Sequence, residues 1–512
     1  MKLGRAYAAA LVGLSATVVE VEAAVGGGLP RTVIVGLPDA ALREARERCR
    51  AAVAQLGRSW PSQLVTINLS PATLPKAGAH YDLAIVAAVL VADEVVPESG
   101  LEGTILMGEF ALDGRIRSAR GLLPVVVAAQ SAGYRRVIVP AVQVSEGRLV
   151  TGIQVVGVAT LAELVAVLQG EPAVEYDPPA RVPDPPMIPD LADVAGQVEA
   201  RWAVEVAAAG GHHLLLSGPP GVGKTLLAER LPGLLPPLSN QAALEVSALR
   251  SISGAGLPDG LIRCAPLSAP HHTASVASLV GGGARIAQPG AVSLAHHGVL
   301  FLDEAPEFST RALEALRTPL ESGQVVLARS EAQAIYPARF QLVVAANPCP
   351  CGLRGTAAGT CICSAMAIRR YAERLSGPIR DRIDVSCHLR PMTQSYLRAA
   401  VGSSESTAIV ASRVAAARER QDRRLRDTRW RVNAAVPGPF LRRELPLPGG
   451  IEVVEQAVAR GQISVRGVDK VLKVAWTLAD LAGRDSPVRE DLLTGLAMRR
   501  GEATVERGHH VG

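Results

Sequence analysis

The sequence predicts an α/β protein with several domains. Three apolar runs, at 214–216, 299–302 and 340–346, have the length of buried strands, and the chain between them can supply crossover helices. Strands that alternate with helices in this way are typical of a sheet covered on both faces. A chain of 512 residues has room for about two to four domains.

Composition places the chain among soluble globular proteins. Hydrophobic residues make up 48% and charged residues 20% of it. The net charge of +5 is mildly basic, so charge by itself is weak evidence for a nucleic-acid partner. The N-terminus lacks the pattern of a secretion signal, and the apolar stretch 83–92 is too short to span a bilayer. We expect a cytoplasmic protein with no membrane partner.

Residues 1–170 are predicted to form a first α/β unit. Strand-like runs alternate there with helical segments, the former including 32–36, 64–68 and 136–140 and the latter including 39–56 and 122–133. Residues 171–188 are rich in proline, which predicts a semi-rigid linker. A second unit is expected at 189–391.

Within the second unit, residues 218–225 read Gly-Pro-Pro-Gly-Val-Gly-Lys-Thr and fit the phosphate-loop pattern G-x-x-x-x-G-K-[ST] without a mismatch. The loop lies between a strand-like run and a helical segment, which is the context the motif requires. Its backbone N–H groups and the following helix N-terminus favour a polyphosphate. Lys224 would reach the β- and γ-phosphates, and the Thr225 hydroxyl would ligate Mg²⁺. The sequence therefore predicts binding of a nucleoside triphosphate by Gly218, Pro219, Pro220, Gly221, Val222, Gly223, Lys224 and Thr225.

Polar residues follow the other two strand-like runs. Asp303 is suited to the Mg²⁺ shell and Glu304 to polarising an attacking water, whereas the simpler alternative is an acidic turn. The long segment between the phosphate loop and this acid pair favours the catalytic interpretation, because it can supply neighbouring strands of the same sheet. Asn347 could orient the water against the γ-phosphate. Together these residues predict hydrolysis of a nucleoside triphosphate with Mg²⁺.

Two arginines follow at 376–384, which reads Ser-Gly-Pro-Ile-Arg-Asp-Arg-Ile-Asp. Arg380 and Arg382 could form a surface ion-pair network, or one of them could enter a neighbouring subunit's site as an arginine finger. Residues 392–512 are expected to hold an arginine-rich helix at 413–431 and then a small helical lid. That helix would present either a solvated face or a surface for DNA or another subunit.

Four of these stretches occur here in order: Gly-Pro-Pro-Gly-x-Gly-Lys-Thr, Phe-Leu-Asp-Glu, Ala-Asn-Pro-Cys-Pro-Cys-Gly and Ser-Gly-Pro-x-x-Asp-Arg-Ile-Asp. Together they resemble the AAA+ ATPases of the magnesium-chelatase-like YifB/ComM family, and the similarity runs essentially from end to end. Further matches lie at 36–39, 68–72, 108–114, 270–275 and 279–283. The resemblance implies a Lon-protease-like (S5-like) N-terminal domain, an AAA+ P-loop core and a magnesium-chelatase-like C-terminal lid.

The resemblance also implies a function. Family members are expected to form ATPase rings, hexameric when active, that translocate on DNA and migrate its branches. Arg382 would be the arginine finger, with Arg380 as its rival, and Arg466 would take the sensor 2 role at the γ-phosphate. Two alternatives remain: an ATP-dependent regulator or assembly factor that acts on protein partners, and a motor subunit for metal insertion into a tetrapyrrole. The full hydrolytic set disfavours the former, and the N-terminal domain and paired cysteines disfavour the latter.

The N-terminal domain is not expected to be a protease. In the comparison with Lon proteases, His80 falls where the serine nucleophile should be, and Val125 lies near the place of the lysine. We expect a non-proteolytic adaptor for an unidentified protein partner, with His80 as a structural histidine.

The cysteines divide into two groups. Cys349, Cys351, Cys361 and Cys363 form two close pairs that fit tetrahedral Zn²⁺, although the C-x-C spacing is tighter than usual. Reduced thiols without metal, and redox chemistry, are the alternatives. Cys49, Cys264 and Cys387 are scattered and are expected to be buried. The histidine pairs His271–His272 and His296–His297 are predicted to be loop structure or a nucleic-acid contact rather than metal ligands, because neither has the i, i+4 spacing.

Overall fold

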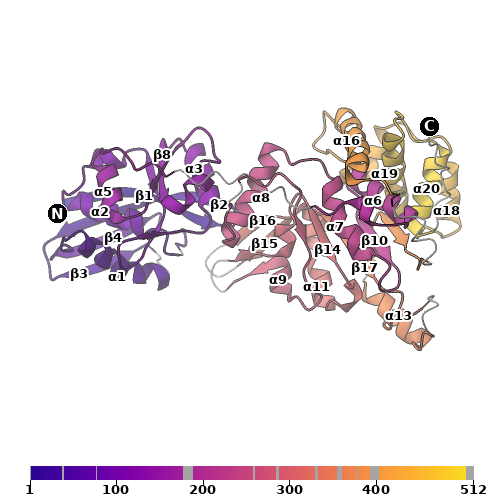
Figure 1. Cartoon of the computed structure of the whole chain (residues 1–512), viewed down its shortest axis with the longest axis horizontal. Helices are drawn as coiled ribbons and strands as arrows, with labels where there is room; N and C mark the ends of the chain where they lie inside the picture. The colour runs from indigo at the N-terminus through magenta and orange to yellow at the C-terminus, as the bar shows by residue number, and fades with distance from the viewer. Residues whose placement is uncertain are drawn as a thin grey trace.

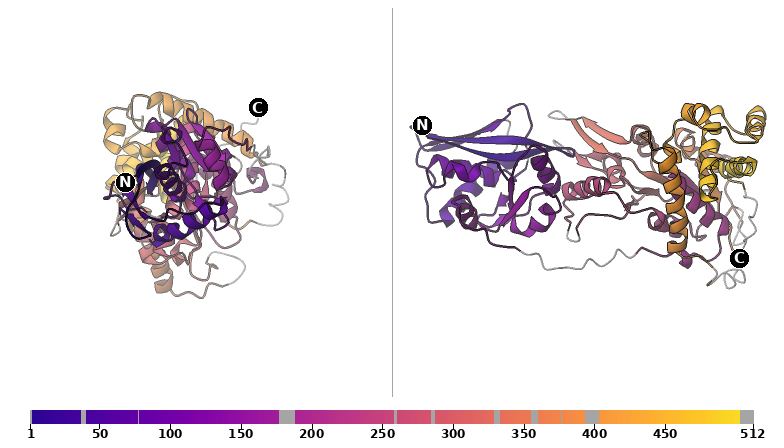
Figure 2. Two further views of the ribbon diagram at one scale, coloured as in Figure 1. Left: turned by 90° about the vertical axis from the view of Figure 1, so that its left-hand side faces the viewer. Right: turned by 90° about the horizontal axis from the view of Figure 1, so that it is seen from above.

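A computed structural model describes residues 2–36, 40–76, 78–176, 188–257, 260–283, 287–328, 333–354, 360–375, 377–392, 402 and 404–502. The predicted linker at 171–188 lies mostly outside this set. The molecule is elongated, with the N-terminal unit at one end, the phosphate-loop unit in the middle and the C-terminal helices at the other end (Figures 1 and 2). No helix in these ranges is both long and apolar enough to cross a bilayer.

The N-terminal unit contains two sheets. The larger has the order β1-β2-β4-β3, and the smaller, β5-β8-β9, is parallel throughout. The strands are β1 (Lys2–Val12), β2 (Ser15–Gly26), β3 (Arg31–Val35), β4 (Leu64–Ser70), β5 (Thr104–Leu106), β8 (Arg136–Pro140) and β9 (Gln154–Val158), with a short β6–β7 hairpin (Glu109–Phe110 and Ile116–Arg117). The helices are α1 (Ala40–Gln55), α2 (Asp82–Ala92), α3 (Leu122–Ser131), α4 (Val144–Gly147) and α5 (Leu161–Leu168). The predicted strands and helices of this unit are present, while the β1–β2 pair was not anticipated.

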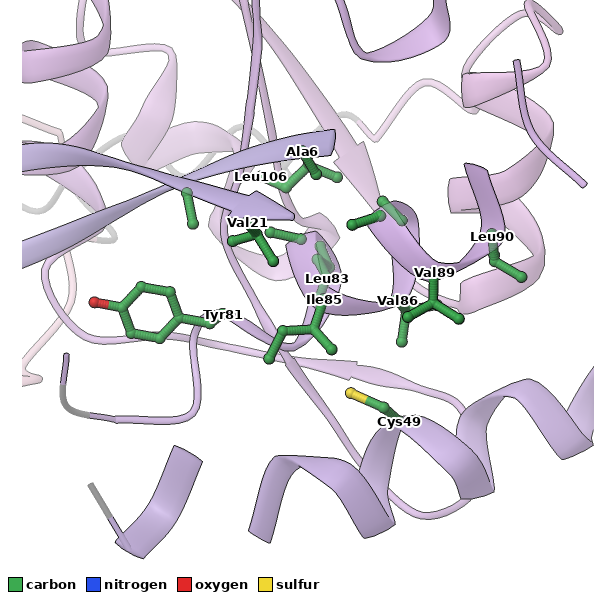
Figure 3. Packing of buried hydrophobic residues seen from close by; sticks show 14 of the residues in the cluster. Ala6, Val21, Cys49, Tyr81, Leu83, Ile85, Val86, Val89, Leu90 and Leu106 are labelled. Atoms are coloured by element: carbon green, nitrogen blue, oxygen red, sulfur yellow. The ribbon is translucent and has the colours of Figure 1, made fainter. Parts of the chain in front are cut away.

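Helix α2 is the centre of this unit because every one of its residues is buried. The apolar stretch that might have suggested a membrane is thus a core helix, packed between the larger sheet and α1. Figure 3 shows Leu83 of α2 beside Val21 of the sheet, and Ile85 of α2 on the opposite side, toward Cys49 of α1. Cys49 is buried as expected. His80, just before α2, lies 2.9 Å through Nε2 from the main-chain oxygen of Ala9, which agrees with a structural role.

The phosphate-loop unit is built on a five-stranded sheet in the order β11-β14-β17-β10-β18, and every pairing in it is parallel. Its strands are β10 (Leu214–Ser217), β11 (Leu267–Ser268), β14 (Val299–Leu302), β17 (Gln341–Ala346) and β18 (Val385–His388). The three strand-like runs of the sequence therefore lie side by side as β14, β17 and β10. This confirms the predicted mixed α/β fold with parallel sheets.

This unit contains helices that pack on both faces of the sheet and others that lie beyond it. They are α6 (Val198–Gly210), α7 (Lys224–Leu234), α8 (Asn240–Ser253), α9 (Val276–Val280), α10 (Ala291–Leu294), α11 (Thr310–Ala315), α12 (Arg317–Ser322), α13 (Ala365–Arg374) and α14 (Gly377–Arg380). Two antiparallel strand pairs complete the unit: β12 (Gly281–Gly282) with β13 (Gln288–Pro289), and β15 (Gln324–Ala328) with β16 (Gln333–Pro337).

The C-terminal part is helical: α16 (Thr407–Arg424), α17 (Gly438–Arg443), α18 (Glu452–Ala459), α19 (Val465–Leu481) and α20 (Arg489–Arg500). Arginines of α16 fasten it to its neighbours. Arg413 binds Glu205 of α6 at 2.7 Å and 2.9 Å, Arg418 donates to the Ala208 oxygen at 3.1 Å, and Arg424 binds Asp480 of α19 at 2.7 Å. These three side chains therefore belong to the packing of the helix.

The N-terminal unit joins the middle unit through α3 and α8. The main-chain N–H of Leu123 donates to the Ser251 hydroxyl at 3.3 Å, and that hydroxyl donates to the buried carboxylate of Glu146 at 2.5 Å. Apolar residues of the two helices, among them Val126 and Ala248, share one buried cluster. The junction is thus a packed contact with its own polar network.

Candidate active site

The phosphate loop connects β10 to α7 and requires glycine at two of its turns. Gly221 and Gly223 have φ values of 78° and 95°, which are left-handed conformations that other residues rarely adopt. Gly218 has no room for a side chain, because a Cβ atom there would lie 2.6 Å from the Leu389 main-chain oxygen. The glycines of the motif therefore fix the path of the loop up to Lys224, where α7 begins.

The Lys224 ammonium is held inside this loop. Its Nζ donates to the main-chain oxygens of Gly218 at 2.6 Å and Pro219 at 2.9 Å, and to Oδ1 of Asn347 at 2.9 Å. Burial lowers the pKa of Lys224, and the nearby carboxylates of Asp303 and Glu304 oppose that shift. The contact with Asn347 brings the end of β17 to the phosphate loop.

Thr225 and Asp303 meet at the same edge of the sheet. The Thr225 hydroxyl donates to Oδ2 of Asp303 at 2.8 Å. A hydroxyl and a carboxylate are the hard oxygen donors that Mg²⁺ prefers, so this pair fits a magnesium ion. The strand order explains the meeting, because β10, β17 and β14 are neighbours and all run in the same direction.

Glu304 follows Asp303 in a strained conformation. Its φ is 49°, which is left-handed and costs a residue with a side chain on the order of 1–3 kcal/mol. Its N–H donates to Oδ1 of Asp303 at 2.9 Å, and its carboxylate is about half exposed. The turn thus directs the two consecutive carboxylates differently, one toward Thr225 and the other toward the loop after β11.

Sequence reasoning missed a neighbour of Glu304. His272 lies in the loop after β11, and its Nδ1 is 3.6 Å from Oε2 of Glu304. The ring of His271 stacks on it at 4.1 Å between centroids. The strand order could have predicted this contact. Because β11 is the neighbour of β14 and runs parallel to it, the segments that follow the two strands reach the same edge of the sheet.

The two predicted catalytic arginines lie at the opposite end of the sheet. Arg382 precedes β18, and the nearby Asp384 N–H donates to the His213 oxygen, just before β10 begins. Arg466, in the first turn of α19, lies close enough to Arg382 to influence its charge. Burial lowers the pKa of Arg382, and repulsion from Arg317 and Arg466 adds to the shift. The structure therefore brings Arg382 and Arg466 together, away from the phosphate loop of the same chain.

Further contacts hold this arginine end in place. Arg382 forms an ion pair with Glu321 of α12. Lys470 of α19 binds the buried carboxylate of Asp384 at 2.6 Å and donates to the Arg382 main-chain oxygen at 3.1 Å. Arg380 instead donates to the main-chain oxygen of Ala372 in α13 at 3.0 Å. The rival arginines thus lie in different surroundings.

The four paired cysteines converge. The sulfur of Cys349 lies 3.4 Å from that of Cys351 and 3.7 Å from that of Cys361, and the latter two are 3.6 Å apart. Cys363 completes a group whose sulfurs all lie within 4.8 Å of one another. Four thiolates around one zinc ion, with zinc–sulfur bonds of about 2.3 Å, would be separated by about 3.8 Å, so the residues fit such an ion. Of the scattered cysteines, Cys387 is buried as expected, but Cys264 is exposed because it lies in the surface segment before β11.

A second cluster joins His296, His297 and Glu245. Each histidine Nε2 lies 2.9 Å from Oε2 of Glu245, so the three groups could surround a cation by distance alone. His296 Nδ1, however, accepts the Arg339 N–H at 3.0 Å. The proton of the neutral ring is therefore on Nε2, directed at the carboxylate, and no lone pair is free there for a metal. The two histidines and Glu245 therefore connect α8 to the segment just before β14.

Comparison with known proteins decides the family. Residues 190–397 match the family described as magnesium chelatase, subunit ChlI, residues 21–143 match subunit ChlI of Mg-chelatase, and residues 404–499 match magnesium chelatase, subunit ChlI C-terminal. Protein YifB of Escherichia coli is 41% identical over 98% of this chain and 97% of its own. Competence protein ComM of Haemophilus influenzae is 37% identical over 98% of each chain. The chain belongs to the magnesium-chelatase-like YifB/ComM family.

An uncharacterised protein of Mycobacterium tuberculosis is similar over the same length, with 52% identity across 98% of this chain and 99% of its own. The YifB/ComM family is of the AAA+ ATPase type, in agreement with a phosphate loop set between β10 and α7 of a parallel sheet. The match at 190–397 contains the entire five-stranded sheet, and the match at 404–499 contains α16 to α19 and all of α20 except its last residue.

Proposed function

We propose that this member of the YifB/ComM family is a ring-forming AAA+ ATPase that couples ATP hydrolysis to translocation on DNA and branch migration. The observation that carries the proposal is the edge where Lys224, Thr225, Asp303, Glu304 and Asn347 meet, because three strand ends there supply different parts of one hydrolytic site. A chain that used nucleotide only as a passive switch would have less need of the full set.

Each residue of this edge has a distinct role in the proposal. Lys224 exchanges its oxygen partners for phosphate oxygens, and Thr225 with Asp303 would hold Mg²⁺, which when bound neutralises charge on the phosphates. Glu304 accepts a proton from the attacking water, for which its half-exposed carboxylate is accessible. Asn347, hydrogen-bonded to Lys224, orients that water against the γ-phosphate.

The position of the arginines favours an oligomer. Arg382 and Arg466 lie at the sheet end opposite the phosphate loop, so we assign their action to the site of a neighbouring subunit. We prefer Arg382 to Arg380 as the finger because Arg382 lies near Arg466, the other arginine of the proposed pair, whereas Arg380 is bonded to α13. A hexameric ring is the arrangement in which each chain would both receive and supply such arginines, and it would use Arg466 as sensor 2 in the same way.

We propose that the ring moves along DNA, because one relative is named a competence protein and the similarity covers nearly the whole of both chains. A regulator or assembly factor acting on proteins is the second candidate, favoured by the packed junction of α3 with α8, through which a partner of the N-terminal unit could act. The chelatase motor is the third, supported by the family names alone. In all three, the N-terminal unit is a Lon-like, non-proteolytic adaptor.

We also propose that Cys349, Cys351, Cys361 and Cys363 hold a structural Zn²⁺. Their convergence carries this proposal, since four sulfurs at these separations match one tetrahedral ion. Elemental analysis of protein purified with a phosphine reductant and without chelator should find about one zinc per chain. Protein that contains no zinc would refute the assignment.

The decisive experiment for the main proposal is the steady-state ATPase rate with and without single-stranded, duplex and four-way-junction DNA. It should be run at two salt concentrations, because phosphate contacts weaken steeply as salt rises. Strong stimulation by DNA that disappears in Glu304→Gln supports the translocase. A rate indifferent to DNA, with no DNA binding even at low salt, would favour the regulator.

A further inference from the structure

The segment that follows Asn347 returns to the catalytic edge. We call residues 348–354 and 360–374 the cysteine arm: they contain the four clustered cysteines and α13. The arm leaves the core at the end of β17, and α13 stands out from the body of the molecule (Figure 1). Although α13 projects outward, two side chains and one glycine of the arm contact parts of the proposed active site.

The first contact is with the phosphate loop. Gly352, one residue beyond Cys351, packs against Pro220, and a Cβ atom on it would lie 2.8 Å from the proline Cδ. Its φ of 74° is left-handed. Glycine is therefore needed here both for the turn and for the close approach. The cysteine cluster is thus only one residue away from the loop that surrounds Lys224.

The second and third contacts come from α13. The buried side chain of Tyr371 lies next to the main chain of Asn347, the residue proposed to orient the water, and near the carboxylates of Glu304 and Glu307. Arg374 donates to the Pro306 oxygen at 3.2 Å and to Oε2 of Glu307 at 3.1 Å, in the turn directly after Glu304. The arm therefore touches the segments on both sides of the proposed attack site.

We propose that a metal ion on the cysteine cluster holds this arm against the catalytic edge, and that metal occupancy thereby sets the rate of ATP hydrolysis. Tyr371 and Arg374 act as positioning residues in this proposal, since they reach the reacting groups only through Asn347 and the turn after Glu304. The inference rests on the proposed ATPase and adds to it a form of control located outside the nucleotide site.

The physical argument concerns the order of the arm. When the four sulfurs share one ion, the two cysteine pairs close the base of the arm and cannot move apart. Without the ion, the arm relies on contacts such as those with Pro220, with the 306–307 turn and with Arg380. A displacement of about 1 Å at a water-orienting group can cost about 100-fold in rate. Loss of the metal should therefore lower turnover more than it lowers nucleotide binding.

The test compares three variants of the full-length protein. The double variant Cys361→Ser/Cys363→Ser removes two of the proposed ligands. Tyr371→Phe keeps all four thiols and removes the hydroxyl that lies next to the main chain of Asn347. Cys264→Ser, at an exposed cysteine outside the cluster, is the matched control. For each, we would measure zinc by elemental analysis, kcat and KM for ATP, affinity for a fluorescent ADP analogue, and hydrogen–deuterium exchange of peptides covering 299–308 and 341–348.

The double variant should lose its zinc and about 10-fold or more in kcat, with ADP affinity within about threefold of the parent. Exchange in 299–308 and 341–348 should rise, while a peptide covering α7 stays protected. Tyr371→Phe should keep zinc and still lose several-fold in kcat, a split that a merely structural metal would not produce. Cys264→Ser should match the parent in every measurement.

Two results would overturn the inference: parent protein without metal, or a zinc-free double variant with parental kcat and parental exchange. A parent that binds zinc but hydrolyses no ATP would refute the proposed function instead. In that case the exchange measurement decides separately, because metal-dependent protection of 341–348 would support the link between cluster and catalytic edge, and unchanged protection would refute it.

Discussion

The two ends of the five-stranded sheet differ in how they balance charge. At the phosphate-loop end, the single ammonium of Lys224 lies among three oxygens and near two carboxylates, all from its own chain. At the other end, Arg317 and Arg466 each lie close enough to repel Arg382, which is paired with Glu321. In the proposed function, the first end binds nucleotide and the second offers positive charge to the nucleotide of a neighbouring subunit. One chain would then present two complementary halves.

The largest effect should come from removing the ammonium of the phosphate-loop end. Lys224→Ala should weaken nucleotide binding by about 100-fold or more and abolish hydrolysis, because no other cation of the loop can replace the contacts to phosphate. Titration with a fluorescent ADP analogue measures this directly. Lys2→Ala, at an exposed lysine of the N-terminal unit, should leave the affinity unchanged. If Lys224→Ala bound the ADP analogue with the parental affinity, the phosphate loop would not be the nucleotide-binding site.

Removing charge from the other end should stop hydrolysis without stopping binding. Arg382→Ala should lower kcat by about 1000-fold while ADP affinity stays near the parental value, since the arginine acts on a neighbour's site. When the Arg382→Ala protein is mixed with the Lys224→Ala protein, part of the ATPase rate should return. Some subunit interfaces then combine an intact phosphate loop from one variant with an intact arginine from the other. Arg380→Ala is the matched control two residues away. Mixed rings that form and stay inactive would argue against action in trans.

A smaller loss should follow from neutralising the base at the phosphate-loop end. Glu304→Gln should lower kcat by about 100- to 1000-fold, because the amide cannot accept the proton of the attacking water. Nucleotide should remain bound, and ATP-loaded assemblies should accumulate, which size-exclusion chromatography with light scattering would reveal. ATP hydrolysis at the parental rate would show that another group activates the water.

Acid should lower the stability of the fold in part through His213, at the arginine end. Burial lowers the pKa of His213, which precedes β10, to about 4. Between pH 6.5 and about 4, the unfolded chain takes a proton on this ring while the folded chain does not. The free energy of unfolding therefore decreases as the pH is lowered through this range. The contribution is at most about 3 kcal/mol. Urea denaturation at several pH values measures it.

A matched pair of variants isolates this effect. His213 Nδ1 accepts the Leu342 N–H at 3.0 Å, a contact that an asparagine amide can retain. His213→Asn should therefore reduce the dependence of stability on pH in this range. His271→Asn, at an exposed histidine, should keep the parental dependence. Identical slopes in both variants would assign the acid sensitivity to other groups, such as the buried His296.

The sequence was a good guide where function follows from local pattern. The phosphate loop, the acid pair and Asn347 each sit at the end of an apolar run, and parallel strands bring such ends to one edge. The contacts of His272 with Glu304 and of Tyr371 with Asn347 were not predicted, because they join loops and helices with no shared spacing. The roles of Arg382 and Arg466 came from family resemblance, and only the topology shows at which sheet end they lie.

The N-terminal unit teaches the same lesson. Its predicted helices and strands agree with the structure to within a few residues, yet the long β1–β2 pair escaped notice. Alanine is frequent in these strands, and alanine has little preference for strands, so the pattern there was weak. Burial of α2 on all sides explains why its apolar run has no helical periodicity.

The arginines of α16 change how the basic composition of the chain should be interpreted. Arg413, Arg418 and Arg424 bind the carboxylates and carbonyl oxygens of α6 and α19, so their charges are unavailable to a polyanion. The number of counterions released when DNA binds would then be smaller than the count of arginines suggests, and affinity would fall less steeply with salt. Lysine could not replace them without loss, because it lacks the planar fork that makes two parallel hydrogen bonds. This region would stay rich in arginine for the sake of helix packing even if the chain never met nucleic acid.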